Sequence, residues 1–157
     1  MVRLEILDVI QAEENTYPLV LLRHDNRVLP ILVGVPEASA IQLGLMREKT
    51  VRPMTHDLIC NLFAGLRAEL ESVTIYQLEN ETFFAHLNVV QKNAQGQVEQ
   101  VLRIDSRPSD GIALAVRVGC PIYASETVME IAAKEATVLG LGGDPGDEEG
   151  LEPDLED

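Results

Sequence analysis

The sequence has few aromatic residues. It contains no tryptophan, three tyrosines and three phenylalanines among 157 residues, whereas 46% of its residues are hydrophobic. A core built around large rings is therefore excluded, and we expect a core made mainly of aliphatic side chains. The length favours a single domain.

Cysteines and long apolar runs are also scarce. Cys60 and Cys120 are too few for a disulfide framework or a cysteine metal site, so we expect buried, reduced thiols. No apolar run reaches the length of a membrane span. The N-terminal segment carries Glu5 and Asp8 within its apolar run, which is untypical of a signal peptide. These features favour a cytoplasmic protein with no membrane partner.

Positive charge is limited to 12 Lys and Arg, against 26 Asp and Glu, which gives a formal net charge of −14. Eight of the acids lie in residues 140–157, a Gly- and Pro-containing segment without Lys or Arg. We therefore expect residues 1–139 to form the domain and residues 140–157 to be a disordered acidic tail. Because no basic stripe with interleaved aromatics is present, composition does not predict strong nucleic-acid affinity.

Hydrophobic periodicity predicts an α+β fold, with helices on a mixed or antiparallel sheet. Alternating apolar residues predict strands, and the Asp25-Asn26 dipeptide predicts a tight hairpin turn. Pro36 and Ser109 stand where helices are expected to begin. The predicted strands cover residues 3–11, 16–24, 27–34, 72–79, 82–91 and 98–106, and the predicted helices cover residues 36–48, 56–70, 109–118 and 126–140.

The second predicted helix has a clear start and a clear apolar side. Thr55 is expected to be its N-cap residue. An apolar stripe at helical spacing should face the core. The stripe consists of Leu58, Leu62, Phe63, Leu66 and Leu70.

Two segments share the same order of features. Residues 15–41 and residues 81–114 each contain a predicted hairpin, a proline, an acidic residue and a helix. Glu37 aligns with Asp110 in these helices, and Ala40 aligns with Ala113. This pattern predicts a duplicated strand–strand–helix unit, although chance similarity between two hairpin–helix units would also produce it.

Two charged segments lead into predicted helices. The first is RIDSRPSDGIALAVR, in which Asp105, Arg107, Ser109, Asp110 and Arg117 surround a Pro-Ser turn. Ser109 or Asp110 can accept hydrogen bonds from the unpaired amides of a first helical turn. Arg107 can bridge two carboxylates through its planar guanidinium.

The second charged segment is VRPMTHDL, with Arg52, His56 and Asp57 around a similar proline. His56 and Asp57 are adjacent on a helix and should point in different directions, so they are not expected to form a pair. Both segments suit helix capping and a structural Arg–Asp network.

A functional interpretation arises if the two helix starts converge on one cleft. Asp57, Asp105 and Asp110, with Glu37 as a further candidate, could then hold a hard divalent cation such as Mg²⁺ or Mn²⁺. Arg52 and Arg107 could bind a phosphodiester. His56 could transfer a proton near neutral pH.

Several motifs resemble the bifunctional nuclease domain family, formerly classed as a domain of unknown function. They are ILVGVPEASAIQLGL, RPMTHDLICNLF, TFFAHL and IDSRPSDGIALAVRVGCPIY, spread in order over residues 1–139. The resemblance implies a compact α+β fold, a homo-oligomer (a dimer being favoured), and hydrolysis of RNA and DNA. It also marks a site region that contains His56, Asp57, Asp105, Arg107, Ser109 and Asp110.

Two main hypotheses follow. In the first, the protein is a nuclease of low sequence specificity, with Asp57, Asp105, Asp110 and His56 as catalytic residues. Arg52, Arg107 and Ser109 would then bind the substrate, with nucleic acid as the partner. In the second, the protein is a non-catalytic, oligomeric regulatory or interaction module, and the Arg–Asp networks only support its helices. A small-ligand pocket between the two repeats is a third possibility.

Overall fold

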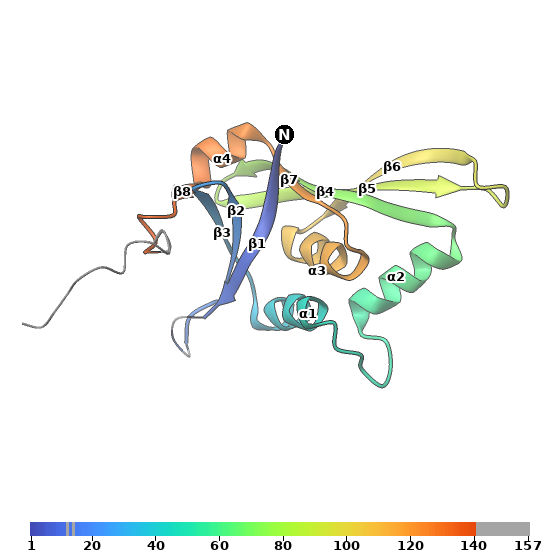
Figure 1. Ribbon diagram of the computed structural model, residues 1–157, viewed down its shortest axis with the longest axis horizontal. Coiled ribbons are helices and arrows are strands. Elements are labelled where there is room, and N and C mark those ends of the chain that lie inside the picture. The colour runs from blue at the N-terminus through green and yellow to red at the C-terminus, as the bar shows by residue number, and fades with distance from the viewer. Residues whose placement is uncertain (12, 14, 141–157) are drawn as a thin grey trace, which may run out of the picture.

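A mixed sheet with helices on it makes up the part of the chain that the structure, a computed structural model, describes: residues 1–11, 13 and 15–140. Within these residues there are eight strands and four helices (Figure 1). The strands are β1 (Val2–Ile10), β2 (Leu19–His24), β3 (Arg27–Leu32), β4 (Ala68–Glu79), β5 (Thr82–Lys92), β6 (Val98–Ser106), β7 (Ile122–Ala124) and β8 (Lys134–Glu135). The helices are α1 (Val35–Met46), α2 (Thr55–Gly65), α3 (Pro108–Val118) and α4 (Glu126–Ala132).

The strand order is β6-β5-β4-β7-β1-β2-β3-β8. β4 and β7 run parallel, and every other neighbouring pair among these strands is antiparallel. The predicted α+β class is therefore confirmed. The helices α1, α2 and α3 lie on the same side of β4, β5 and β6 (Figure 1).

Helix α3 is the centre of the core. Its residues Ile112, Ala113, Leu114 and Ala115 are all buried. The helix approaches the sheet closely at Gly111, where an added Cβ atom would lie 2.7 Å from Cγ1 of Val73. The largest fully buried side chains in the described residues are Leu, Ile, Val and Met. The core is aliphatic, as the lack of aromatic residues predicts.

The second predicted helix is shorter than expected. α2 ends at Gly65, and β4 begins at Ala68, so the helix predicted through residue 70 is wrong at its C-terminal end. Arg67 lies between the two elements in the left-handed region, with φ of 54°. Leu58, Leu62 and Leu66 are exposed, whereas Ile59 and Phe63 pack against the core. The predicted stripe is therefore right at Phe63 and wrong at Leu58, Leu62 and Leu66, because the side of the helix that faces the core runs through Ile59 and Phe63.

Other boundaries shift as well. The helix predicted over residues 126–140 ends at Ala132, and residues Lys134–Glu135 form the short edge strand β8 instead. The predicted hairpins are found, and both β2–β3 and β4–β5 are closed by two-residue turns. In these turns Asp25, Asn80 and Glu81 have positive φ, as tight hairpin turns commonly require.

Two groups of elements follow the same order, β2–β3–α1 and β5–β6–α3. In each group an antiparallel hairpin leads into a helix. A common origin of the two groups by duplication stays a prediction. The predicted acidic tail lies outside the described residues, apart from Gly140. None of the helices in the described residues is long and apolar enough to span a membrane.

The close approach at Gly111 yields a test of the packing. Gly111→Ala places a methyl group against Val73, so we expect a loss of about 1–3 kcal/mol in the free energy of unfolding, typical of overpacking. Urea denaturation of the two proteins measures it. Gly65→Ala is the matched control, because an added Cβ there meets no atom within 4 Å, and it should cause no loss. Equal stability of all three proteins would contradict the packing described here.

Candidate functional site

The first turns of α1, α2 and α3 meet at one pocket. Its volume is about 400 Å³. A larger hollow of about 560 Å³ beside β1 and β2 contains none of the predicted site residues. A third hollow, of about 410 Å³, is lined by Asp57 alone among the predicted site residues. The pocket at the helix starts contains three of them and is therefore the candidate site; its lining consists of Pro36, Glu37, Ser39, Ala40, Leu43, Met54, Thr55, His56, Arg107, Asp110 and Arg117.

The three helix starts have an unusual feature in common. Their N-cap residues are Gly34, Met54 and Arg107, none of which has a side-chain oxygen that could accept hydrogen bonds from first-turn amides. The prediction that Thr55 would be the N-cap residue is therefore wrong, and no side chain accepts a cap hydrogen bond at the start of α3, where Ser109 or Asp110 was expected to do so. By contrast, the remote helix α4 is capped by Ser125, whose Oγ accepts from the backbone N–H of Val128 at 3.2 Å. Three helix N-termini whose N-cap residue lacks a side-chain oxygen thus line one pocket. Helix N-termini favour negative charge, and each first turn here already carries an acid, with Asp57 accepting from the Met54 backbone N–H in α2.

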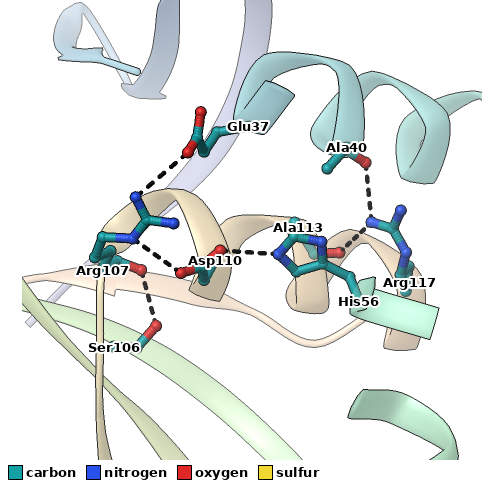
Figure 2. Close-up of polar contacts among 8 residues, drawn as sticks. All are labelled: Glu37, Ala40, His56, Ser106, Arg107, Asp110, Ala113 and Arg117. Carbon is teal, nitrogen blue, oxygen red and sulfur yellow. Dashed lines mark hydrogen bonds and ion pairs between the residues drawn. The ribbon is translucent and has the colours of Figure 1, made fainter. Parts of the chain in front are cut away.

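His56 and Asp110 form a pair inside this pocket (Figure 2). The His56 Nε2 lies 2.9 Å from Asp110 Oδ1, and His56 is only 9% exposed. A carboxylate accepts hydrogen bonds, so Nε2 carries the proton, and a neutral ring then has an accepting lone pair at Nδ1. No described residue forms a hydrogen bond with Nδ1. Among the described residues, every fully buried polar side-chain atom has a hydrogen-bond partner, so Nδ1 is not fully buried and solvent can reach it.

Arg107 joins this pair to the start of α1. Its Nε donates to Asp110 Oδ2 at 3.1 Å, and its Nη1 donates to Glu37 Oε1 at 3.3 Å (Figure 2). The hydrogen bond to Asp110 raises the pKa of Arg107, which is 67% exposed. The predicted bridging of two carboxylates by Arg107 is thus present in the structure. Glu37, which the sequence indicated only as a further candidate, is one of the two.

Asp57 and Arg117 form a separate, structural network. Arg117 Nε donates to Asp57 Oδ1 at 2.9 Å, and Arg117 Nη1 donates to the carbonyl oxygens of Ala40 and Ala113 at 3.0 and 2.8 Å. The second oxygen of Asp57 accepts from the backbone N–H of Met54 at 3.0 Å. This hydrogen bond, followed by the one from Arg117, lowers the pKa of Asp57. Both oxygens of Asp57 are therefore occupied by structural contacts.

The remaining predicted residues lie elsewhere. Asp105 is exposed on β6, opposite His86 in the register, on the face of the sheet that points away from the helices. Arg52 is exposed in the α1–α2 connection and does not line the pocket. Ser109 is buried and borders a neighbouring hollow of about 300 Å³. Of the residues predicted for the site, His56, Arg107 and Asp110 are brought together.

The predicted metal ligands do not form one group. Asp57 binds Arg117, Asp105 is exposed on β6, and the two oxygens of Asp110 accept hydrogen bonds from His56 and Arg107. In the described residues no group of three or more His, Cys, Asp or Glu side chains is arranged to hold a metal ion. The proposed set for Mg²⁺ or Mn²⁺ therefore does not fit, because strand alternation turns Asp105 away and Arg117 holds Asp57.

The sequence did not indicate that Arg117 connects three helices. Its partners Ala40, Asp57 and Ala113 belong to α1, α2 and α3, and two of them are backbone carbonyl groups, which no side-chain motif can reveal. The available signal was an arginine placed within an otherwise apolar helix, two turns from Asp110.

Comparison with known proteins gives two findings. A family model described as the bifunctional nuclease domain matches residues 19–137. The uncharacterized proteins MT1877 and Rv1829, from two strains of Mycobacterium tuberculosis, are each 37% identical to this chain over 131 residues. Each alignment covers 82% of this chain and 74% of the relative.

The lowered pKa of Asp57 predicts how its contribution depends on pH. Its ionised form stabilises the folded chain, so the contribution is complete above the ordinary value of 3.8 and is lost as pH falls through the lower pKa of the folded state. Asp57→Asn should therefore lower the melting temperature at pH 7 and 5, and the difference from the unsubstituted protein should shrink below pH 3.8. Circular dichroism melts at pH 7, 5 and 3 measure this difference. Asp105→Asn serves as the control and should leave the melting temperature nearly unchanged at pH 7. A difference for Asp57→Asn that grows toward pH 3 would contradict the assignment.

Proposed function

Because the chain belongs to the bifunctional nuclease domain family, as its motifs predicted, we propose that this pocket hydrolyses phosphodiester bonds. The substrates would be RNA and DNA, cut with little sequence preference. One observation carries the proposal: a His–Asp pair and an exposed arginine lie where three helix N-termini without an oxygen-bearing cap converge. Helix N-termini and an arginine suit a phosphate, and the His–Asp pair suits proton transfer.

Substrate binding would use the positive ends of the helices together with Arg107. Two guanidinium nitrogens of Arg107 already bind Asp110 and Glu37, which fixes the direction of the planar group. Its remaining N–H groups could donate to a phosphate oxygen from this fixed position. A guanidinium that is already oriented needs little reorganisation as negative charge develops on the phosphate.

Proton transfer would use His56. A water molecule beside the phosphate would give its proton to His56 Nδ1 while its oxygen forms a bond to phosphorus. The bond from phosphorus to the leaving oxygen breaks, and that oxygen takes a proton from solvent. Asp110 would hold the ring in the required tautomer and stabilise the imidazolium, the role a carboxylate has beside a general-base histidine. Because water is the nucleophile, a ribose 2′-hydroxyl is not needed, and DNA is a substrate as well as RNA.

No step in this scheme passes through a metal ion, because the carboxylates of the predicted set do not meet. Assays with and without Mg²⁺ or Mn²⁺ would test that separately. The predicted cytoplasmic location and homo-oligomeric state, a dimer being favoured, are parts of the same proposal.

A second function is favoured by one observation. Arg117 links α3 to α2 through Asp57 and to α1 through the carbonyl oxygen of Ala40, as expected of a structural Arg–Asp network. If the His56–Asp110 pair has the same purpose, the protein is a non-catalytic regulatory or interaction module. The experiment below separates the two.

The test uses the purified full-length chain with labelled single-stranded RNA and DNA, and with bis(p-nitrophenyl) phosphate as a small chromogenic phosphodiester. His56→Ala and Asp110→Asn should each lower the rate by about 10²–10⁴-fold, the usual effect of removing general acid–base catalysis. Asp25→Asn is the matched control, because it makes the same chemical change at an exposed side chain in the β2–β3 turn, outside the pocket, and it should keep the full rate. Equal rates in all four folded proteins would point to a contaminating nuclease and support the non-catalytic alternative.

A further inference from the structure

The sheet face that points away from α3 gathers most of the aromatic side chains that the core does not use. The register places His86 and Tyr123 on either side of the buried Thr74, and it places Phe84 opposite Gln77. Along these strands the intervening residues Ile75, Ala85 and Ala124 point into the core and are fully buried. In Figure 1, α1, α2 and α3 all lie on the opposite side of β4, β5 and β6.

Tyr76 owes its position to an irregularity in β4. Ile75 pairs with Ala85 and Gln77 pairs with Phe84, so Tyr76 is an extra residue on β4 with no partner of its own. Such bulges redirect a side chain and recur near functional sites. The Tyr76 ring centroid lies 4.9 Å from that of His86 and 6.4 Å from that of Phe84. The ring of Tyr76 is tilted by 46° to that of Phe84 and by 31° to that of His86, and Phe84 and His86 are partly buried; we call this cluster of three rings the aromatic platform.

The composition of the chain makes this platform notable. Only six Phe and Tyr residues are present, and three of them (Tyr76, Phe84 and Tyr123) stand on this face. Tyr76 is 38% exposed. The aliphatic core does not need these rings for packing, and exposed aromatic surface on a sheet has a recognised use in stacking against nucleobases.

Polar groups border the platform on β5 and β6. Arg103 lies opposite Asn88, is exposed, and forms no ion pair with any residue that the structure describes. Asn88 donates to the hydroxyl groups of Ser72 and Thr74 at 2.9 and 3.0 Å, which fixes its amide. Burial, and then the nearby charge of Arg103, lower the pKa of His86, so its ring is neutral at pH 7 and can stack. The rings, the fixed amide and the cation of Arg103 suit a base and its phosphate, although the carboxylate of Asp105 lies on the same face opposite His86.

The platform and the pocket lie at the same end of the β4–β5 hairpin. Phe83 borders the hollow that also contains Glu37 and Arg107, on the helix side of the sheet. Phe84 follows it on β5 and points to the other side. A flexible strand that reaches the pocket around the two-residue turn at Asn80 and Glu81 would therefore meet the platform.

We propose that the aromatic platform binds unpaired nucleotides of a single-stranded nucleic acid, with bases stacked on Tyr76 and Phe84 and a phosphate at Arg103. This inference rests on the proposed function for its choice of ligand. A single strand is required because base faces are hidden in a duplex, and stacking on Tyr76 and Phe84 needs those faces. RNA and DNA share this chemistry, and the experiment distinguishes them.

The experiment measures binding by fluorescence anisotropy, with labelled oligouridine, labelled oligodeoxythymidine and a duplex of equal length. A His56→Ala background prevents cleavage during the measurement. Tyr76→Ala and Phe84→Ala should each weaken single-strand binding by about 5- to 150-fold, the effect of losing one stacked base. Tyr76→Phe should bind nearly as well as the unsubstituted residue, and the duplex should bind weakly to every variant. Tyr17→Ala is the matched control, because Tyr17 is also exposed but lies away from this face, and it should have no effect.

Two further measurements make the outcome decisive. In the His56-containing protein, Tyr76→Ala should slow hydrolysis of the labelled single strands at low substrate concentration more than hydrolysis of bis(p-nitrophenyl) phosphate, because that substrate contains no nucleobase. Loss of hydrolysis in every protein, with Tyr76-dependent binding retained, would refute the proposed function and leave the platform standing. Binding that is absent, or that is unaffected by Tyr76→Ala and Phe84→Ala, would overturn the platform. A change in oligomeric state by light scattering, without a change in binding, would assign this face to a second copy of the chain and also overturn it.

Discussion

The geometry of the candidate site depends on the buried guanidinium of Arg117. It lies in α3, binds the carboxylate of Asp57 in α2, and donates to the carbonyl oxygens of Ala40 in α1 and Ala113 in α3. A buried charge is tolerated only when its hydrogen-bonding groups are satisfied, so these partners cannot drift apart without a large penalty. Gly44 allows this arrangement, because an added Cβ there would lie 2.8 Å from Arg117 Nη1. Arg117 therefore fixes three helices relative to one another, and their first turns form the pocket as a consequence.

Two adjacent residues of α2 have different roles in this arrangement: Asp57 is structural, and His56 belongs to the candidate site. His56 and Asp57 project about 100° apart on the helix, so they reach different partners on α3. Asp57 binds Arg117 two turns into α3, whereas His56 binds Asp110 in its first turn. The Arg117–Asp57 pair holds the helix that carries His56, and the His56–Asp110 pair lines the pocket, where Nδ1 of His56 has no hydrogen-bond partner among the described residues. The two carboxylates look equivalent in the sequence, but their neighbours give them different roles.

The sequence predicted the elements and part of the site, and its errors have physical causes. The strand over residues 98–106 has the predicted limits, and the charged segments before α2 and α3 do converge. The sequence indicated Glu37 of α1 only as a further candidate, and it did not predict its hydrogen bond with Arg107. A single acid after a proline is also typical of a helix start that has no functional role. Asp105 was grouped with Asp110 by proximity in the sequence, yet strand alternation turns it to the opposite face of β6. The stripe through Leu58 and Leu62 has helical spacing but is exposed, since periodicity identifies an apolar side without identifying what covers it.

The structure also bears on how a chain of net negative charge could bind a phosphate. A polyanion is usually bound through many Lys and Arg side chains, and this chain has only 12. At the pocket three helix N-termini converge beside the exposed Arg107, and each first turn also carries an acid: Glu37, Asp57 or Asp110. The partial charges at helix N-termini act over one helical turn, so they favour a phosphate inside the pocket without attracting long nucleic acids to the rest of the surface. In such a site, binding of one phosphate does not depend on the net charge of the chain. Stacking of bases on the rings of the platform would add affinity for a strand that electrostatic attraction alone does not provide.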